Sequence, residues 1–296
     1  CSQSPSDPES FGEAVLQTFI EEDYDSFREM TAPELSRSQL EDVLEEIVGE
    51  SKELFLESGG SIFNFIPCLN GDDKFIKTLE NIINSVGNIK YEILVCDDGS
   101  KDNSKEIVKN YINREKKNII LYENDKNLGI GFSYFKYSLE AKGEYYMLIN
   151  GDNVEPSITI KKIINEKGKA DIIIPYLGTD DHRNLIRKFI SHLFTFVINL
   201  ISFNSIKYYN GPVLHKTENV RLYRSKTYGY GYQAELITTL LMLEKSYLQV
   251  QVTNTDRQWG ASKAFSISNI LSILNTTLSI FINRIANLKN ILTVRK

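Results

Sequence analysis

The chain has 296 residues, a formal net charge of −5, 42% hydrophobic residues and 25% charged residues. This balance is typical of a globular protein with one large domain or two, and it excludes a disordered chain and wholesale binding of nucleic acid. The three cysteines, Cys1, Cys68 and Cys96, lack metal or redox spacing. Cys68 and Cys96 lie in apolar, strand-like runs, which fits buried thiols of a reducing compartment. No apolar run is long and uncharged enough to predict a helix that spans a membrane.

The N-terminal part of the chain differs in composition from the rest. Residues 11–57 are dense in Asp and Glu, and Ser38 with Glu41 three positions later forms a capping box, which is typical of a helix start. Ser58, Gly59 and Gly60 then interrupt the chain. The predicted organisation is a helical segment with a flexible tail (1–57), a linker (58–60), a main domain (61–266) and a C-terminal amphipathic helix (267–296).

From residue 61 onward, short apolar runs alternate with segments of helical periodicity. The predicted strands cover 61–67, 92–96, 118–122 and 145–149, and the predicted helices cover 73–86, 104–114 and 132–141. Each strand is a continuous apolar run, as expected for a strand that is buried on both faces. We therefore predict an α/β fold with a mostly parallel sheet and helices on both faces.

Polar motifs follow three of these strands. They are Pro67 to Asn70, Asp97 with Asp98, and Asn150 to Asp152. Ligands of such sheets bind outside the carboxyl ends of the strands, so the three motifs predict one site on a shared edge. Asp152 could bind a hard divalent cation that holds a diphosphate, and Asp97 or Asp98 could accept hydrogen bonds from a nucleobase or a ribose. Taken singly, each motif is also explained as a turn that caps the next helix.

Six motifs in order, IPCLN, VCDDGSKDNS, NDKNLGIGFSY, INGDNVEP, GYGYQAELI and DRQWGASK, resemble those of family-2 glycosyltransferases of the GT-A fold. The resemblance covers about residues 61–266 and is strongest to the dolichyl- or polyprenyl-phosphate mannosyltransferase type. It implies a Rossmann-like GT-A domain, a nucleotide-diphosphate sugar as donor, Mg²⁺ or Mn²⁺ as cofactor, and inversion at the anomeric carbon.

The resemblance also assigns roles to residues of the donor site. The implied donor-binding residues are Pro67, Leu69, Asn70, Asp97, Asp98, Asn150, Gly151, Asp152 and Lys263. Asp152 is the implied metal ligand, and the implied catalytic residues are Asp152, Arg257 and Glu235. The chain departs from the family at Gly71, where Glu is frequent, and at Asn150, where the first acid of the Asp-X-Asp motif is expected. Losing that carboxylate should weaken metal binding, which puts metal dependence in doubt.

The acceptor side leaves three alternatives. The implied acceptor-binding residues are Arg183, Arg187, Gln233 and Arg257. A polyprenyl phosphate is already ionised and needs no general base, and Gln233 with Glu235 resembles the lipid-phosphate pattern. A glycan hydroxyl as acceptor would instead need Glu235 as its base. The third alternative is a non-catalytic relative that holds nucleotide or lipid.

Two segments predict contact with a membrane surface. Residues 183–203 begin with basic side chains and then become apolar, and the resemblance implies an amphipathic helix that lies on the membrane, although a core helix has the same pattern. Residues 264–292 predict a second interfacial helix or a homodimer contact. We expect a peripheral protein at the cytoplasmic membrane face, active in cell-envelope polysaccharide synthesis and without a nucleic-acid partner. The start at Cys1 is similar to that of a mature bacterial lipoprotein, and it conflicts with this location.

Overall fold

The computed structural model describes residues 63–68, 73–100, 103–115, 118–178, 181, 183, 185–222, 229, 231–255 and 273–285. The chain divides into two units, Cys1–Gly59 and Gly60–Lys296, and all described residues belong to the second. The predicted N-terminal helices therefore lie outside the described residues. The same is true of four predicted site residues, which are Leu69, Asn70, Arg257 and Lys263.

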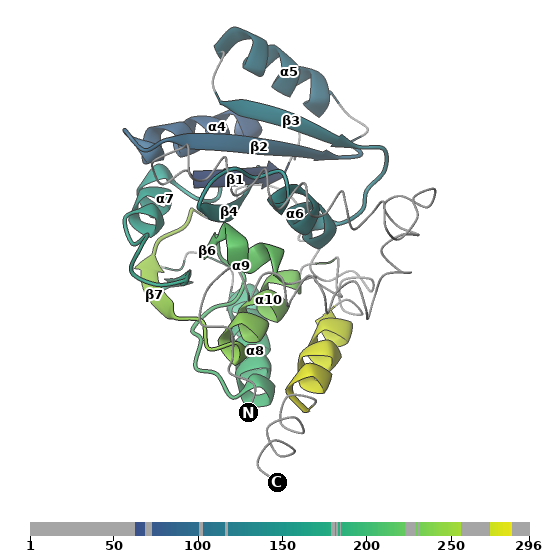
Figure 1. Cartoon of the computed structure of the whole chain (residues 1–296), viewed down its shortest axis with the longest axis vertical. Coiled ribbons are helices and arrows are strands. Elements are labelled where there is room, and N and C mark those ends of the chain that lie inside the picture. Colours follow the sequence, from purple (N-terminus) through teal and green to yellow (C-terminus); the bar gives the residue numbers. More distant parts are fainter. Residues whose placement is uncertain are drawn as a thin grey trace, which may run out of the picture. The chain divides into compact units, whose positions relative to one another are not determined.

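Strands and helices alternate along the described chain (Figure 1). The strands are β1 (Phe63–Cys68), β2 (Tyr91–Asp98), β3 (Ile119–Asn124), β4 (Tyr145–Asn150), β5 (Ile172–Leu177), β6 (Leu214–Lys216) and β7 (Tyr247–Val252). The helices are α4 (Asp73–Val86), α5 (Ser104–Glu115), α6 (Ile130–Ser138), α7 (Ser157–Ile164), α8 (Leu185–Ser202), α9 (Thr217–Arg221) and α10 (Tyr232–Met242). A further helix, without a label in Figure 1, covers residues 273–285.

The strands form one seven-stranded sheet in the order β3-β2-β1-β4-β6-β5-β7. Neighbouring strands run parallel except at β6, which is antiparallel to both β4 and β5. The helices that join parallel strands cross over the sheet, as connections between parallel strands require. The predicted α/β fold with a mostly parallel sheet is confirmed.

The two faces of the sheet are covered by different sets of helices. On one face, α4, α5 and α7 pack against strand side chains such as Val95 and Met147. On the other face, α6, α8, α9, α10 and the 273–285 helix pack against alternate side chains of the same strands, such as Leu94 and Tyr146. Successive residues of a strand point to opposite faces, so one apolar run fills both cores. This explains why the strands read as continuous apolar runs in the sequence.

Candidate functional site

The carboxyl ends of β1, β2 and β4 meet at one edge of the sheet. Cys68, the last residue of β1, pairs with Cys96 of β2 on one side and with Asn150 of β4 on the other. The backbone of Pro67 pairs with Ile149. Asp97 with Asp98 and the Asn150–Asp152 motif therefore begin at the same edge, as predicted from the alternation of strands and helices.

Asp98 binds the loop that follows β3. Its Oδ1 accepts hydrogen bonds from Asn124 Nδ2 and from the backbone N–H of Leu128, each at 2.9 Å. Its Oδ2 accepts one from the backbone N–H of Gly129, also at 2.9 Å. Asp97 is buried, and its Oδ1 accepts the backbone N–H of Ser100 at 2.9 Å. Both carboxylates thus organise loops at the sheet edge, and their contact with a nucleotide stays a prediction.

The loop after β4 carries Asp152 and is held from two sides. Asn153 has a positive φ of 60°, a conformation that Asn tolerates better than most residues. From α4, Asn81 Nδ2 donates to Asn153 Oδ1 at 2.8 Å. From the segment after β7, the backbone N–H and the hydroxyl of Thr255 both donate to the carbonyl of Val154 at 3.0 Å. These contacts fix the backbone on the C-terminal side of Asp152.

Replacing Asn81 with alanine is expected to loosen this loop. The left-handed residue Asn153 loses its side-chain partner, and a lost hydrogen bond of this kind is worth roughly 1 kcal/mol of unfolding free energy. We expect several-fold weaker binding of Mn²⁺ together with a nucleoside diphosphate, the ligands that the resemblance implies, measured by calorimetry. Asn153→Gly is the matched background because glycine adopts positive φ without support. In the Asn153→Gly background, Asn81→Ala should cause no further loss of affinity. An equal loss of affinity in the wild-type and Asn153→Gly backgrounds would contradict the role of Asn81.

A cavity of about 140 Å³ lies at the carboxyl ends of β4, β5 and β7 and reaches the first turn of α8. It brings together four of the predicted site residues, which are Asn150, Asp152, Arg183 and Arg187. Glu155, Tyr208 and Asn254 also line it, and none of these three was predicted as a site residue. Asp97, Asp98, Gln233 and Glu235 are not among its described lining residues.

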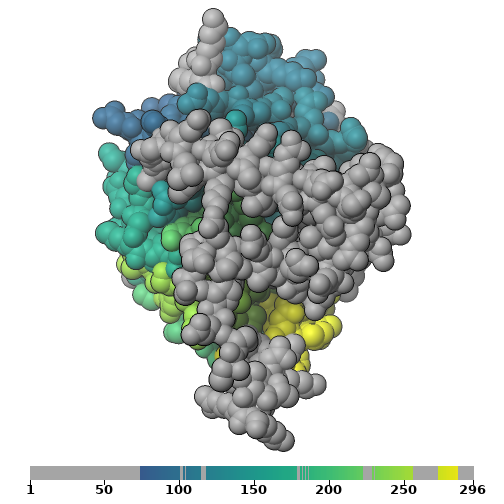
Figure 2. All heavy atoms as spheres, viewed as in Figure 1, coloured from purple at the N-terminus to yellow at the C-terminus, as the bar shows by residue number. Residues whose placement is uncertain are grey.

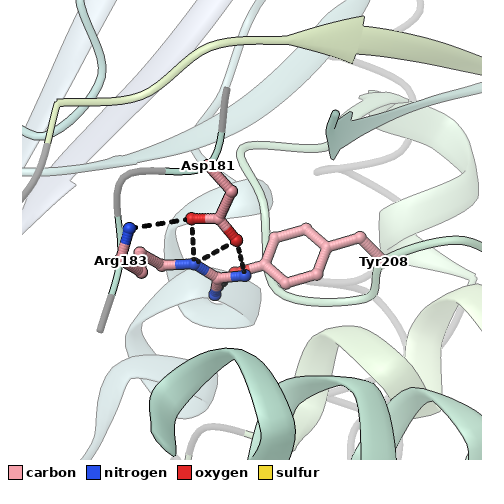
Figure 3. Close-up of polar contacts among 3 residues, drawn as sticks. All are labelled: Asp181, Arg183 and Tyr208. Carbon is pink, nitrogen blue, oxygen red and sulfur yellow. Dashed lines mark hydrogen bonds and ion pairs between the residues drawn. The ribbon is translucent and has the colours of Figure 1, made fainter. Parts of the chain in front are cut away.

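The two cavity-lining arginines have different surroundings. Arg183 forms two parallel hydrogen bonds with Asp181, Nε to Oδ1 at 2.9 Å and Nη2 to Oδ2 at 2.8 Å (Figure 3). Burial acts to raise the pKa of Asp181, but the side-chain and backbone hydrogen bonds from Arg183, together with the charges of Arg183 and Lys188, lower that pKa. Arg187 forms no ion pair within the described part of the chain. Of the two predicted acceptor-binding arginines, Arg187 is therefore the one whose charge is available to a ligand.

Gln233 and Glu235 lie on the first turn of α10 and make contacts inside the protein. Gln233 Nε2 donates to the carbonyls of Tyr209 and Gly211 at 2.6 and 2.7 Å. Because Gly211 lines the cavity, Gln233 supports the cavity wall from behind. Glu235 is fully buried, and its Oε1 accepts a hydrogen bond from Ser279 Oγ at 2.6 Å. That contact joins α10 to the helix of residues 273–285.

The cavity offers oxygen ligands that fit a hard divalent cation. Asn150, Asp152, Glu155 and Asn254 all line it, and Mg²⁺ and Mn²⁺ prefer carboxylate and amide oxygens. Asn254 Oδ1 is buried without a hydrogen-bond partner in the described part of the chain. No group of three His, Cys, Asp or Glu among the described residues could hold a metal by itself. The donor set therefore suits a cation that takes its other ligands from a bound diphosphate.

Three comparisons relate the chain to known proteins. A 57-residue stretch is 46% identical to a ferrochelatase of Vibrio parahaemolyticus and covers 19% of this chain and 18% of that protein. A 141-residue stretch is 27% identical to a dolichyl-phosphate beta-glucosyltransferase of Trichomonas vaginalis and covers 42% of this chain and 43% of that protein. The chain therefore spans less than half the length of each of these relatives.

The third comparison is with a crystal structure of glucosyl-3-phosphoglycerate synthase from Mycobacterium tuberculosis in complex with Mn²⁺, uridine diphosphate and phosphoglyceric acid. The two structures superpose with a TM-score of 0.55 at 15% identity, over 78% of this chain and 82% of that chain. At this identity the likeness establishes a shared GT-A fold.

The family is shown by a match along the chain itself. The family model described as "Glycosyl transferase family 2" matches residues 65–230, which is more than half of the chain. The matched range begins within β1, extends past α9 and includes the described edge of the sheet at which Asp97, Asp98 and Asp152 lie. The resemblance inferred from the ordered motifs is thereby confirmed, and the chain belongs to glycosyl transferase family 2.

Proposed function

We propose that the protein is an inverting glycosyltransferase that moves a sugar from a nucleotide-diphosphate sugar to a polyprenyl phosphate at a membrane surface. The observation that carries this proposal is α8. Its first turn places Arg187 in the cavity with Asp152, and its outer face is apolar and exposed. One helix thus connects a cation suited to a phosphate with a surface suited to lipid.

The exposed face of α8 is a continuous apolar stripe. Its large side chains recur every three or four residues, as on one side of a helix. They are Leu185, Phe189, Leu193, Phe196 and Leu200, with Phe203 just beyond the helix. Phe189 is 68% exposed and Phe196 is 63% exposed. The opposite side, which includes Ile198, is buried against the sheet. Apolar patches that stay exposed on a protein surface mark sites of membrane or partner contact.

The helix of residues 273–285 carries a second exposed stripe, formed by Leu274, Leu278, Phe281, Ile282 and Ile285. Its buried side, at Ile280, joins the same core as α8 and α10, and its atoms (yellow) form part of the surface in Figure 2. The guanidinium of Arg284 lies 5.4 Å from the ring centre of Phe203, so this helix contacts the end of α8. No helix in the described residues is long and apolar enough to cross a membrane. The two stripes support a helix pair that lies on the surface of a bilayer.

The proposed reaction is a single displacement. An oxygen of the acceptor phosphate forms a bond to the anomeric carbon while the bond from that carbon to the β-phosphate oxygen breaks, and a nucleoside diphosphate leaves. Asp152 would hold a divalent cation, which when bound supplies the positive charge that neutralises the charge developing on the leaving diphosphate. Arg187 orients the acceptor phosphate on the other side of the sugar. The residues proposed to hold the nucleotide are Asp97, Asp98, Pro67, Leu69, Asn70 and Lys263. Arg257 is proposed to hold the acceptor phosphate.

The position of Glu235 supports a phosphate over a hydroxyl as the acceptor. A hydroxyl must lose its proton, and Glu235 was the residue that could take it. The carboxylate is buried, is bonded to Ser279 and is not among the described cavity-lining residues. An ionised phosphate needs no base. The name of the dolichyl-phosphate beta-glucosyltransferase and the Mn²⁺ and uridine diphosphate in the superposed synthase add support for the acceptor and for the donor side.

The proposal is tested by nucleotide release from a panel of nucleotide-diphosphate sugars, with Mn²⁺ and with or without a short polyprenyl phosphate. We expect release that depends on the lipid phosphate. Arg187→Ala should raise the KM for the lipid phosphate roughly ten-fold or more, because a hydrogen-bonded charge pair is lost. Lys161→Ala, which removes an exposed cation of α7 outside the cavity, is the matched control.

Each of the other outcomes has a definite meaning. Release that requires a soluble saccharide instead of the lipid phosphate would favour transfer to a hydroxyl acceptor. Binding of a nucleotide without release under any condition would favour a non-catalytic relative. An unchanged KM for the lipid phosphate in Arg187→Ala would remove Arg187 from the acceptor site.

A further inference from the structure

Tyr208 lines the cavity together with the two arginines, and its hydroxyl lies next to Arg183. Its oxygen accepts a hydrogen bond from Arg183 Nη1 at 3.1 Å, and the guanidinium lies 5.1 Å from its ring centre (Figure 3). Tyr208 and Arg183 line the same cavity as Arg187 and Asp152. A tyrosine hydroxyl has one proton to donate, and Arg183 has no acceptor to offer it. The proton is therefore available to a group in the cavity.

Asp181 fixes the position of Arg183 and neutralises it. Besides the two parallel hydrogen bonds, the backbone N–H of Arg183 donates to Asp181 Oδ1 at 3.0 Å. The side chains of Arg183 and Asp181 are only 11% and 9% exposed. Buried ion pairs of this geometry are rigid, because breaking one leaves an unpaired charge. The Asp181–Arg183 pair therefore holds the hydroxyl of Tyr208 in place without adding net charge to the cavity.

The hydroxyl stays protonated at neutral pH. Burial raises the pKa of Tyr208 above its ordinary value of 10.0. The charges of Arg183 and Arg187 act to lower this pKa, and those of Glu155 and Asp181 act to raise it. Arg187 lines the same cavity as Tyr208, so a neutral donor and a cation belong to one cavity wall.

We propose that the hydroxyl of Tyr208 donates a hydrogen bond to the acceptor phosphate beside Arg187, and that Asp181 and Arg183 are a positioning pair for this hydroxyl. The inference rests on the proposed function, since it takes a phosphate monoester as the acceptor. Hydrogen bonds to a charged oxygen are roughly twice as strong as those between neutral groups. Tyr208 therefore favours a lipid phosphate over the corresponding alcohol.

The test is direct binding to the full chain, which does not depend on turnover. Calorimetry with Mn²⁺ and uridine diphosphate present would measure the affinity for a short polyprenyl phosphate and for the matching polyprenol. Tyr208→Phe is expected to weaken binding of the phosphate roughly ten-fold while leaving the affinity for the alcohol unchanged. Tyr247→Phe, which removes the hydroxyl of an exposed tyrosine at the start of β7, is the matched control. Unchanged phosphate affinity in Tyr208→Phe would overturn the inference.

Failure of the proposed function would look different. A wild-type chain that binds the lipid phosphate but transfers no sugar to it would overturn the proposed function. The inference on Tyr208 would still stand if Tyr208→Phe weakened that binding. A wild-type chain that does not bind the lipid phosphate at all would overturn both.

A double-mutant cycle separates positioning from direct contact. Asp181→Asn combined with Arg183→Met removes the pair without leaving a buried charge. If the pair acts through Tyr208, this variant should weaken phosphate binding about as much as Tyr208→Phe and add nothing in the Tyr208→Phe background. Losses that add would show that Arg183 contacts the phosphate itself, and they would overturn its positioning role.

Discussion

Replacing Asp152 with asparagine is expected to lower the rate of sugar transfer roughly a hundred- to a thousand-fold, the size of effect seen when one charge-stabilising contact is removed from an active site. Asp152 lines the cavity and is the proposed ligand of the divalent cation. Asparagine keeps the shape of the side chain but removes the negative charge that a hard cation prefers. Position 150 already carries an amide in place of the family's first acid, so the motif has no second carboxylate to compensate.

The measurement is the initial rate of nucleotide release over a titration of Mn²⁺, together with Mn²⁺ binding in the presence of uridine diphosphate. Asp152→Asn should lose both activity and metal affinity while its thermal unfolding stays close to that of the wild type. Glu140→Gln removes an exposed carboxylate in the turn after α6, outside the cavity, and should leave both unchanged. Equal rates for Asp152→Asn and wild type at every Mn²⁺ concentration would exclude Asp152 as a metal ligand.

The first half of the sheet could be predicted from the sequence because its signals are local. The predicted helix 73–86 coincides with α4, and the predicted strand 145–149 ends one residue before β4 does. The second half depends on pairing between distant segments. Strand β6 has only three residues, and Leu214 is placed by its partners Met147 of β4 and Ile173 of β5. No periodic pattern can arise in so short a strand.

The residues of the candidate site also fall into those with a local sequence signal and those placed by the pairing of distant segments. Asp152 stands out because it follows an apolar strand within a motif of fixed spacing. Glu155 lies in that same stretch, INGDNVEP, and was open to prediction. Tyr208 and Asn254 reach the cavity only because β5, β6 and β7 bring their flanking segments beside β4. The pairing of Arg183 with Asp181, two residues away, is a local signal that the prediction of Arg183 as an acceptor-binding residue did not weigh.

The stability of the fold is expected to fall as the pH drops below 6.5, because of His215. This residue of β6 is fully buried, and its Nδ1 has no hydrogen-bond partner among the described residues. Its neighbours across the sheet are Tyr146 and Ile172, which carry no charge to stabilise an imidazolium. Burial lowers the pKa of His215 from 6.5 to about 3. The folded protein therefore resists protonation at a pH where the unfolded chain accepts the proton.

The sign and size of this pH effect follow from the difference in proton binding between the unfolded and the folded chain. Between about pH 6.5 and pH 3 the unfolded chain binds one more proton at this histidine than the folded chain does. The free energy of unfolding then decreases by about 1.4 kcal/mol for each unit of falling pH, which gives about 2 kcal/mol between pH 8 and pH 5. Above about pH 6.5 the imidazole is neutral in both the folded and the unfolded chain, so the loss of stability is absent there. Asp171 and Asp181, whose pKa values are lowered from an ordinary 3.8, bind their protons in the unfolded chain near pH 4, below the range from pH 8 to pH 5. Glu92, whose pKa is raised from 4.5, acts in the opposite direction, because the folded chain binds its proton first.

Urea unfolding at pH 8, 7, 6 and 5 would measure the slope of the unfolding free energy against pH. His215→Leu replaces the imidazole with a neutral side chain and should flatten it, so that the variant gains stability relative to wild type as the pH falls. His192→Gln alters an exposed histidine of α8 and should keep the wild-type slope. If His215→Leu does not fold, the ring ¹⁵N shifts of His215 in the wild type give the same answer. Shifts that titrate near pH 6.5 in the folded protein would contradict the burial of a neutral imidazole, and with it the expected loss of stability.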